Sequence, residues 1–499
     1  MPAFFRPTRV CLAALALLGG CATGQGDAWL TTKTPYQPRQ AAASYALAPA
    51  GYTPVHTQLV ARHGTRGMTG MKDDLALLKM CRAAAREQAL TPLGLALMGD
   101  IEKLIEAQLL LGYGVEGIAK PGYANLTRTG IEEHRQLARR VVARQEGLFA
   151  RGDGRSIVVQ HSGVDRARDS AAFFMAALLE AAPAMQGAIE TGPPSGVNRS
   201  SLYFHKLSAK TDGQPAPGAS GSAVFTASQA YQHYLDSPRL QARLDAIHAD
   251  PRLQAAARTV LARLFSKDFI DRLAAGQLRF ANSGTMVATS ADGKYQVRDE
   301  GKGTTVLASP VDVLMALSAL YEIAPGLKNE LGRDFRPYLP EEQARLIAWA
   351  NDAEDFYAKG PGFIEDAPVS YQMAQGLLAD FFDEAEQGGK RHRASFRFSH
   401  AEIIIPMATL LGLPGSEQPL REGQTFSYAS NPWRGRDVAP YAANIQWDTV
   451  RNAEGRLLVR MLYNERETDF KPACDGARFA AGSHFYEVRA LRRCYLGGQ

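Results

Sequence analysis

The feature that most constrains this chain is a short apolar run, Leu-Val-Ala at residues 59–61, that leads directly into Arg-His-Gly-Thr-Arg at residues 62–66. Residues 55–61 predict a buried strand, and open α/β sheets bind their ligands at the carboxyl ends of their strands. Two guanidinium groups can neutralise a phosphoryl group while the imidazole between them attacks it. The segment therefore predicts an α/β fold with a phosphate site after this strand. A buried strand followed by an ordinary basic turn is the alternative.

Two further segments end in the same way. Residues 157–160 form a short apolar run, and the loop that follows contains Arg166. Residues 393–398 alternate between apolar and polar side chains, which predicts a strand, and His400 and Glu402 follow directly. Three strand ends that each carry phosphate-binding or proton-transferring side chains predict one shared site.

The first 20 residues have the layout of a bacterial export signal. Arg6 and Arg9 precede the apolar run at residues 10–18, and Cys21 follows two glycines. This ending resembles a lipoprotein signal, in which the chain is cut before the cysteine and that cysteine is lipidated. We expect a lipid anchor at Cys21 and an exported protein, either an outer-membrane lipoprotein or periplasmic. An ordinary signal peptide cleaved near Ala22 is the alternative.

The length of 499 residues predicts two to three domains. Residues 21–50 are rich in Gly, Thr, Gln and Pro, which is typical of a tether. The predicted strands lie in residues 51–185 and 390–499, which we assign to one α/β domain. Residues 186–389 carry mainly helical patterns and predict an inserted helical domain. The net charge of +5 includes Arg6 and Arg9 of the expected signal, and the remaining 5 − 2 = +3 is too small to indicate a nucleic-acid partner.

The cysteines fit an exported protein. Cleavage of the signal removes Cys11, and lipidation would occupy Cys21. Cys474 and Cys494 then form the natural disulfide pair, and Cys81 is left free. No Cys or His pair has the spacing of zinc ligands, so we expect no metal. Beyond the signal, we expect no segment that could span a membrane.

The chain resembles the histidine acid phosphatases, which carry Arg-His-Gly-x-Arg early and His-Asp or His-Ala-Glu late. The resemblance extends from about residue 55 to about residue 465 and includes Leu-Thr-x-x-Gly at 126–130 and Tyr-Asn-Glu at 463–465. Residues 400–402 are His-Ala-Glu, so the chain is most similar to the multiple inositol polyphosphate phosphatases. The family usually has proline at the position of Met68. The resemblance implies a phosphoglycerate-mutase-like sheet flanked by helices, with an inserted helical domain.

The resemblance also implies roles for individual residues. His63 would be the nucleophile and Glu402 the proton donor to the leaving alcohol. The residues implied to bind the substrate phosphate are Arg62, Arg66, Arg166 and His400. Arg199 and Lys206 lie where the helical insert begins and are candidate specificity residues. Arginines and a histidine can stabilise the transition state without a metal, so no cofactor is expected.

An inositol polyphosphate such as phytate is the implied substrate. Two alternatives stay open. One is an acid phosphatase of broad specificity that acts on sugar phosphates or phosphoglycerates with the same residues. The other is an anion-binding lipoprotein without catalysis.

Overall fold

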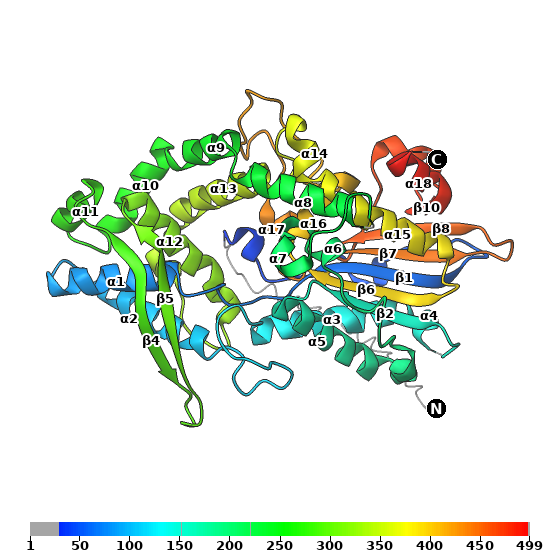
Figure 1. The fold of residues 1–499 in the computed structure, drawn as a ribbon, viewed down its shortest axis with the longest axis horizontal. Coiled ribbons are helices and arrows are strands. Elements are labelled where there is room, and N and C mark those ends of the chain that lie inside the picture. Colours follow the sequence, from blue (N-terminus) through cyan, green and yellow to red (C-terminus); the bar gives the residue numbers. More distant parts are fainter. Residues whose placement is uncertain (1–28, 151, 220, 498–499) are drawn as a thin grey trace, which may run out of the picture.

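The computed structural model describes residues 29–150, 152–219 and 221–497 and forms two lobes, one built on a sheet and one mainly helical (Figure 1). The predicted signal and Cys21 lie outside the described residues. The strands are β1 Thr53–Arg62, β2 Ser156–His161, β3 Gly196–Val197, β4 Phe280–Thr289, β5 Gln296–Leu307, β6 His392–Ser399, β7 Asn444–Arg451, β8 Leu457–Tyr463, β9 Arg466–Thr468 and β10 Phe485–Glu487.

The helices divide between the two lobes. Those that contact the sheet or its connections are α3 Arg128–Arg144, α4 Glu146–Phe149, α5 Asp165–Ala181, α6 Arg199–Leu202, α15 Gln375–Gln387, α16 Ala401–Leu411, α17 Gly435–Val438 and α18 Val488–Leu496. The others are α1 Asp73–Arg86, α2 Pro92–Leu109, α7 Ala209–Asp212, α8 Ser222–Leu235, α9 Pro238–His248, α10 Pro251–Ala262, α11 Lys267–Ala274, α12 Pro310–Ile323, α13 Glu341–Ala358 and α14 Ala367–Ser370.

The main sheet has the strand order β10-β8-β7-β1-β6-β2-β3, with β9 paired to β8. Strands β1, β6, β2 and β3 are parallel, whereas β7, β8 and β10 are antiparallel. At the carboxyl ends, Arg62 is opposite Ser399 and His161 is opposite Phe398. This register places the three predicted catalytic loops at one edge of the sheet, and the α/β fold class is confirmed.

The two faces of the sheet are covered by different helices. Helices α3 and α5 cover one face, below the sheet in Figure 1, where Leu59, Phe396 and Phe398 pack in one core with Phe174 of α5. Helices α15 and α16 cover the other face. The core on that side extends without a break into α12 and α13 of the helical lobe. The helical lobe therefore shares its core with one face of the sheet.

The predicted strands at residues 55–61, 157–160 and 393–398 are all present. Helices α2, α3 and α12 each begin at a side-chain cap, because the hydroxyl oxygens of Thr91, Thr127 and Ser309 accept a hydrogen bond from a backbone N–H in the first turn.

The predicted boundary between the lobes differs from the structure in two ways. Helix α1, within the range assigned to the α/β domain, packs on β4 and α12 of the helical lobe. The helical lobe also contains the long antiparallel hairpin β4–β5, where mainly helices were expected. The hairpin strands are largely solvent-exposed, so their apolar alternation is weak. The Asp-Gly pair at 292–293 in the connecting turn is the hairpin signal that could have revealed them.

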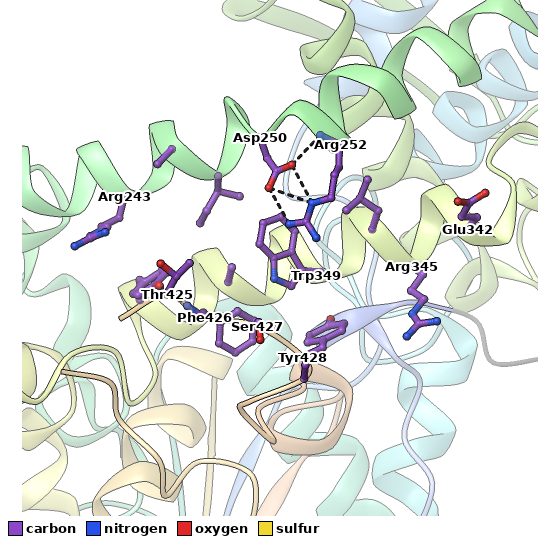
Figure 2. Close-up of a pocket in the computed structure, with 16 residues that line it drawn as sticks. Arg243, Asp250, Arg252, Glu342, Arg345, Trp349, Thr425, Phe426, Ser427 and Tyr428 are labelled. Atoms are coloured by element: carbon purple, nitrogen blue, oxygen red, sulfur yellow. Dashed lines mark hydrogen bonds and ion pairs between the residues drawn. The ribbon is translucent and has the colours of Figure 1, made fainter. Parts of the chain in front are cut away.

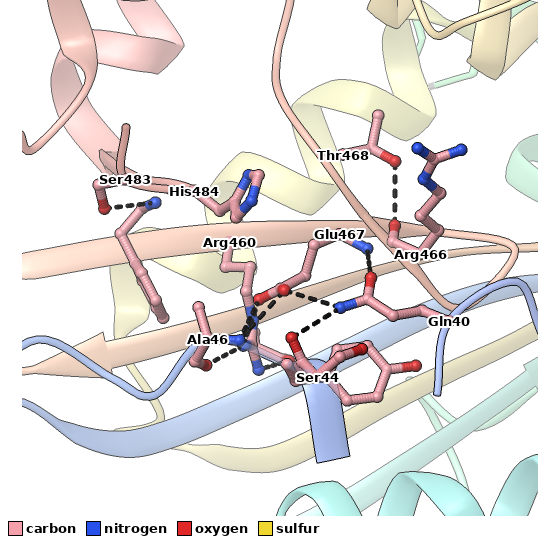
Figure 3. A network of polar contacts seen from close by, with 12 residues as sticks. Gln40, Ser44, Ala46, Arg460, Arg466, Glu467, Thr468, Ser483 and His484 are labelled. Carbon is pink, nitrogen blue, oxygen red and sulfur yellow. Dashed lines mark hydrogen bonds and ion pairs between the residues drawn. The ribbon is translucent and has the colours of Figure 1, made fainter. Parts of the chain in front are cut away.

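The expected tether is wrong for its described part, from Trp29 onwards. Leu30 and Tyr36 are buried in the fold. Farther along, Arg460 of β8 donates hydrogen bonds to the Ala46 carbonyl and to Glu467, which also accepts from Gln40 (Figure 3). Partly buried hydrogen bonds of this kind fix a segment despite its tether-like composition. The described residues before β1 are thus part of the globular protein.

Two expectations about other segments can be compared with the described residues. Cys474 and Cys494 form the predicted disulfide, with their Cα atoms 5.7 Å apart, and Cys81 is free and buried. Contrary to expectation, one described helical segment, residues 310–327, is long and apolar enough to cross a membrane. In the structure 78% of it is buried inside the protein, where it packs as a core helix.

Two glycines allow the loop after β1 to lie directly on the first turn of α3. A Cβ atom at Gly64 would be 2.3 Å from the carbonyl oxygen of Gly130, and a Cβ at Gly130 would be 2.0 Å from the carbonyl oxygen of Thr65. Neither position has room for any side chain. The glycines of the Arg-His-Gly-x-Arg and Leu-Thr-x-x-Gly motifs therefore allow the backbones of the two motifs to pack directly against each other.

We expect Gly130→Ala to destabilise the protein by about 1–3 kcal/mol, because the new methyl group must displace backbone rather than a flexible side chain. Thermal unfolding should show a lower Tm. The matched control is Gly99→Ala in α2, where a Cβ meets nothing within 4 Å and helix propensity predicts a gain of about 1 kcal/mol. Equal Tm values for the two variants would contradict this account.

Candidate active site

The three strand ends bring the residues of the predicted site together. His63 follows β1, His400 follows β6 and N-caps α16, and Arg166 lies in the first turn of α5 after β2. The ring centroids of His63 and His400 are 5.4 Å apart. One Nη atom of Arg166 donates a hydrogen bond to Nδ1 of His400 at 3.2 Å. Residues more than 300 positions apart thus form one cationic cluster.

Among the residues that the structure describes, only one ring nitrogen of His63 has a hydrogen-bond partner. Its Nδ1–H donates a hydrogen bond of 2.9 Å to the carbonyl oxygen of Gly64, which leaves Nε2 with the lone pair. Burial, and then the charges of Arg166, Arg62 and Arg66, lower the pKa of His63 well below its usual value. The imidazole is therefore neutral, as a nitrogen nucleophile must be.

The three arginines around His63 have guanidinium donors that no described residue uses. Nη1 of Arg62 donates to the carbonyl oxygens of Thr32 and Ala439, and Nη1 of Arg66 donates to that of Gly67. The Nε atoms of Arg62, Arg66 and Arg166 are buried and have no hydrogen-bond partner among the described residues. Burial, with Arg66 nearby, lowers the pKa of Arg166 to about 10. Guanidinium groups with buried, unpaired N–H donors of this kind are suited to bind an anion.

His400 is oriented by Ser162, a residue that the sequence analysis did not identify. Nε2 of His400 lies 2.9 Å from the Ser162 hydroxyl, and Nδ1 accepts from Arg166. Because a guanidinium group only donates, Nε2 carries the proton here. The serine hydroxyl can also donate, so it can support the opposite tautomer when Nδ1 has to donate to a phosphate oxygen. Its position directly after β2 was the available signal.

Glu402 lies in the first turn of α16 and faces Lys359, the residue directly after α13. Their Oε1 and Nζ atoms are 3.6 Å apart, and Lys359 also donates to Asp355 at 2.8 Å. Burial favours the protonated form of Glu402, but the opposing effect, chiefly the charge of Lys359, is larger and holds its pKa well below the usual value. Glu402 is therefore a carboxylate in this arrangement. Lys359 ends a helix of the other lobe, so no sequence motif identified it.

The two candidate specificity residues lie at the margin of the cluster. Arg199 forms an ion pair with Asp212 and stacks on Tyr203, its guanidinium carbon 4.3 Å from the ring centroid. Tyr203 in turn packs against His400, with centroids 5.2 Å apart. Lys206 is exposed, whereas its neighbour His205 is buried beside His400. The structure thus brings Arg199 close through Tyr203 and does not bring Lys206 into the cluster.

The absence of the usual proline is explained by a hydrogen bond. The backbone N–H of Met68 donates to Oε1 of Gln108 at 2.9 Å, which a proline could not do because it has no N–H. The preceding residue is also restricted, because a Cβ at Gly67 would be 2.2 Å from the same oxygen. Gln108 of α2 therefore fixes the loop that carries Arg66.

The Tyr-Asn-Glu motif, residues 463–465, stabilises the loop that contacts Arg62. The Tyr463 hydroxyl donates to the carbonyl of Val438, and the Asn464 amide donates to that of Asp437. Glu465 is fully buried and accepts hydrogen bonds from Arg140 and Arg144 of α3. The motif thereby holds residues 437–441, which supply the Ala439 carbonyl and the Tyr441 ring to Arg62.

A separate cavity of about 580 Å³ lies in the helical lobe between α9, α10, α13 and the loop at 425–429 (Figure 2). Its aromatic side chains are those of Trp349, Tyr357, Phe426 and Tyr428. None of the predicted site residues lines it. The geometry of the strand ends, rather than the size of a cavity, therefore identifies the candidate active site.

Comparison with known families agrees with this geometry. The model of the histidine phosphatase superfamily, branch 2, matches residues 55–464, most of the chain. The chain belongs to this family. The multiple inositol polyphosphate phosphatase of Bifidobacterium longum, solved with phosphate, is 31% identical, with a TM-score of 0.83 over 94% of this chain and 97% of that one. The resemblance predicted from the motifs is confirmed.

The same bacterial enzyme has also been solved with inositol hexasulfate, at 30% identity and a TM-score of 0.81. The multiple inositol polyphosphate phosphatase 1 of Gallus gallus is 23% identical over 192 residues, 36% of this chain and 41% of that protein. The human protein of the same name is 22% identical over 134 residues, 25% and 28% of the two chains. The matched segments thus span less than half of these curated relatives.

Proposed function

We propose that this protein is an exported phosphomonoesterase that hydrolyses inositol polyphosphates such as phytate through a phosphohistidine intermediate. The observation that carries the proposal is the neutral His63, whose Nε2 has no partner among the described residues and lies within a cluster of three arginines whose Nε donors are likewise unpaired there. The similarity to the B. longum enzyme, solved with inositol hexasulfate, supports the choice of substrate.

In the first step, Nε2 of His63 attacks phosphorus and the ester P–O bond breaks. Negative charge on the transferred group is stabilised by Arg62, Arg66, Arg166 and His400. Glu402, in its protonated form, gives its proton to the leaving oxygen, because an inositol alkoxide departs poorly without one.

In the second step, water attacks the phosphorus of the phosphohistidine. The Glu402 carboxylate formed in the first step takes a proton from that water, and the P–N bond breaks. Inorganic phosphate leaves, and His63 returns to the neutral tautomer that donates to Gly64. Glu402 is again protonated, so protons and charges balance over the cycle.

The test of this function is phosphate release from phytate and from simple monoesters, across acidic and neutral pH, with a chelator present. We expect phytate turnover that survives the chelator. Comparable turnover of sugar phosphates or phosphoglycerates would instead indicate the acid phosphatase of broad specificity. Binding without phosphate release would indicate the anion-binding lipoprotein.

Glu402→Gln tests the proton donor. We expect the variant to lose at least a hundredfold in kcat on phytate, because general acid catalysis contributes about 10²–10⁴-fold. With p-nitrophenyl phosphate the phenolate leaves without a proton, so a burst of phenolate should persist while later turnover is slow. Stopped-flow absorbance measures the burst. Equal loss of the first step with both substrates would show that Glu402 serves binding or structure.

We also propose that the chain is exported and anchored to the outer membrane through lipidated Cys21, with a periplasmic protein as the alternative. The support is the signal-like layout of the first 20 residues and the disulfide between Cys474 and Cys494, which is typical of exported proteins.

Mass spectrometry of the protein from a bacterial host's envelope tests the anchor. We expect the mature chain to begin at Cys21 with a lipid-sized mass increase, and Cys21→Ala to remove that increase. An unmodified amino terminus at another residue in the wild type would contradict the anchor.

A further inference from the structure

The ion pair between Lys359 and Glu402 joins the two lobes at the candidate proton donor. Lys359 comes from the helical lobe, whereas His63 and the arginines come from the strand ends of the sheet. The exposed fractions of the Lys359 and Glu402 side chains are 25% and 31%. Both groups can therefore be reached by a substrate.

Besides Lys359, the charged or titratable groups around this ion pair come from six elements. Asp355 of α13 acts on Lys359. The groups that act on Glu402 itself are Tyr231 of α8, His205 before α7, His400 at the start of α16, Arg166 of α5 and Arg62 of β1. Burial lowers the pKa of His205 to about 4 and that of His400 well below its usual value, so both imidazoles are neutral near pH 6. Lys359 is the cation nearest to Glu402, and Asp355 competes for it.

This pairing conflicts with the role of a general acid. An acid must carry a proton before it can donate one, yet a carboxylate beside an ammonium group loses its proton readily. A phosphate group carries up to two negative charges, so it attracts the ammonium more strongly than a carboxylate at the same distance. A substrate with a second phosphate group can therefore compete for Lys359.

We propose that Lys359 is a positioning residue that keeps Glu402 ionised until a second phosphate group of the substrate binds its ammonium. Glu402 then takes a proton from solvent and passes it to the leaving oxygen. The inference rests on the proposed function. Under this proposal a polyphosphate has a higher kcat than a monophosphate as well as a higher affinity. Only the polyphosphate carries a second phosphate group that can bind Lys359 and release Glu402 from the ion pair.

The experiment compares the pH dependence of kcat for phytate and for an inositol monophosphate. On the alkaline side of each profile kcat falls as Glu402 loses its proton, and we call this part of the curve the basic limb. In the wild type, the basic limb should lie at least about one pH unit higher for phytate than for the monophosphate. In Lys359→Met, the limb for the monophosphate should move up to meet that for phytate, because no ammonium depresses the pKa of Glu402 with either substrate. Lys359→Arg should keep the two limbs apart, since the charge is retained.

Asp355→Asn should shift the basic limb for the monophosphate in the direction opposite to Lys359→Met. Without Asp355, Lys359 acts on Glu402 alone, so the limb for the monophosphate should move to lower pH. Lys267→Met, which removes an exposed lysine of α11, is the control for loss of a distant charge and should leave both limbs in place. Thermal unfolding checks that each variant is folded, and Asp355→Asn decides the question if Lys359→Met does not fold.

The inference is overturned if Lys359→Met leaves the two limbs as far apart as in the wild type, or if Asp355→Asn moves the limb upwards. A different result would show that the proposed function itself is wrong. His63→Ala that still releases phosphate from phytate would remove the mechanism itself, whatever the behaviour of Lys359.

Discussion

The buried guanidinium group of Arg62 is the point at which three distant parts of the chain meet. Arg62 is the last residue of the central strand β1, and its guanidinium group donates to the carbonyl oxygens of Thr32, before the sheet, and of Ala439, between α17 and β7. It also lies 4.5 Å from the centroid of the Tyr441 ring. A buried charge has to be satisfied by such partners. The strand, the packed N-terminal segment and the loop held by the Tyr-Asn-Glu motif are therefore positioned together with the site.

The two lobes contribute different chemistry. The sheet supplies the nucleophile and the arginines from strand ends in fixed register, a rigid arrangement suited to stabilise developing charge. The helical lobe supplies Lys359, which contacts Glu402 from outside the sheet. Because the lobes share a continuous core, this second contribution is also held in place.

The sequence predicted the parts of the fold that local patterns determine. Strands β1, β2 and β6 were visible as apolar or alternating runs, and the loops after them identified His63, Arg166 and His400 as neighbours. Lys359 was missed because it follows a helix of the other lobe and no spacing in the chain reports its contact with Glu402. Ser162 follows β2 directly, but its partner His400 comes from a distant part of the chain. The packed segment from Trp29 was missed for the same reason: its composition is that of a tether, and tertiary hydrogen bonds to β8 and β9 override it.

The central claim is that Nε2 of His63 becomes covalently phosphorylated. The most direct measurement is rapid quenching of Glu402→Gln in alkali during the burst with p-nitrophenyl phosphate, followed by peptide mass spectrometry and ³¹P NMR. The account predicts one phosphate per chain, on Nε2 of His63, because Nδ1 donates to the carbonyl of Gly64. Phosphate on Nδ1, on another residue or on none during the burst would contradict it.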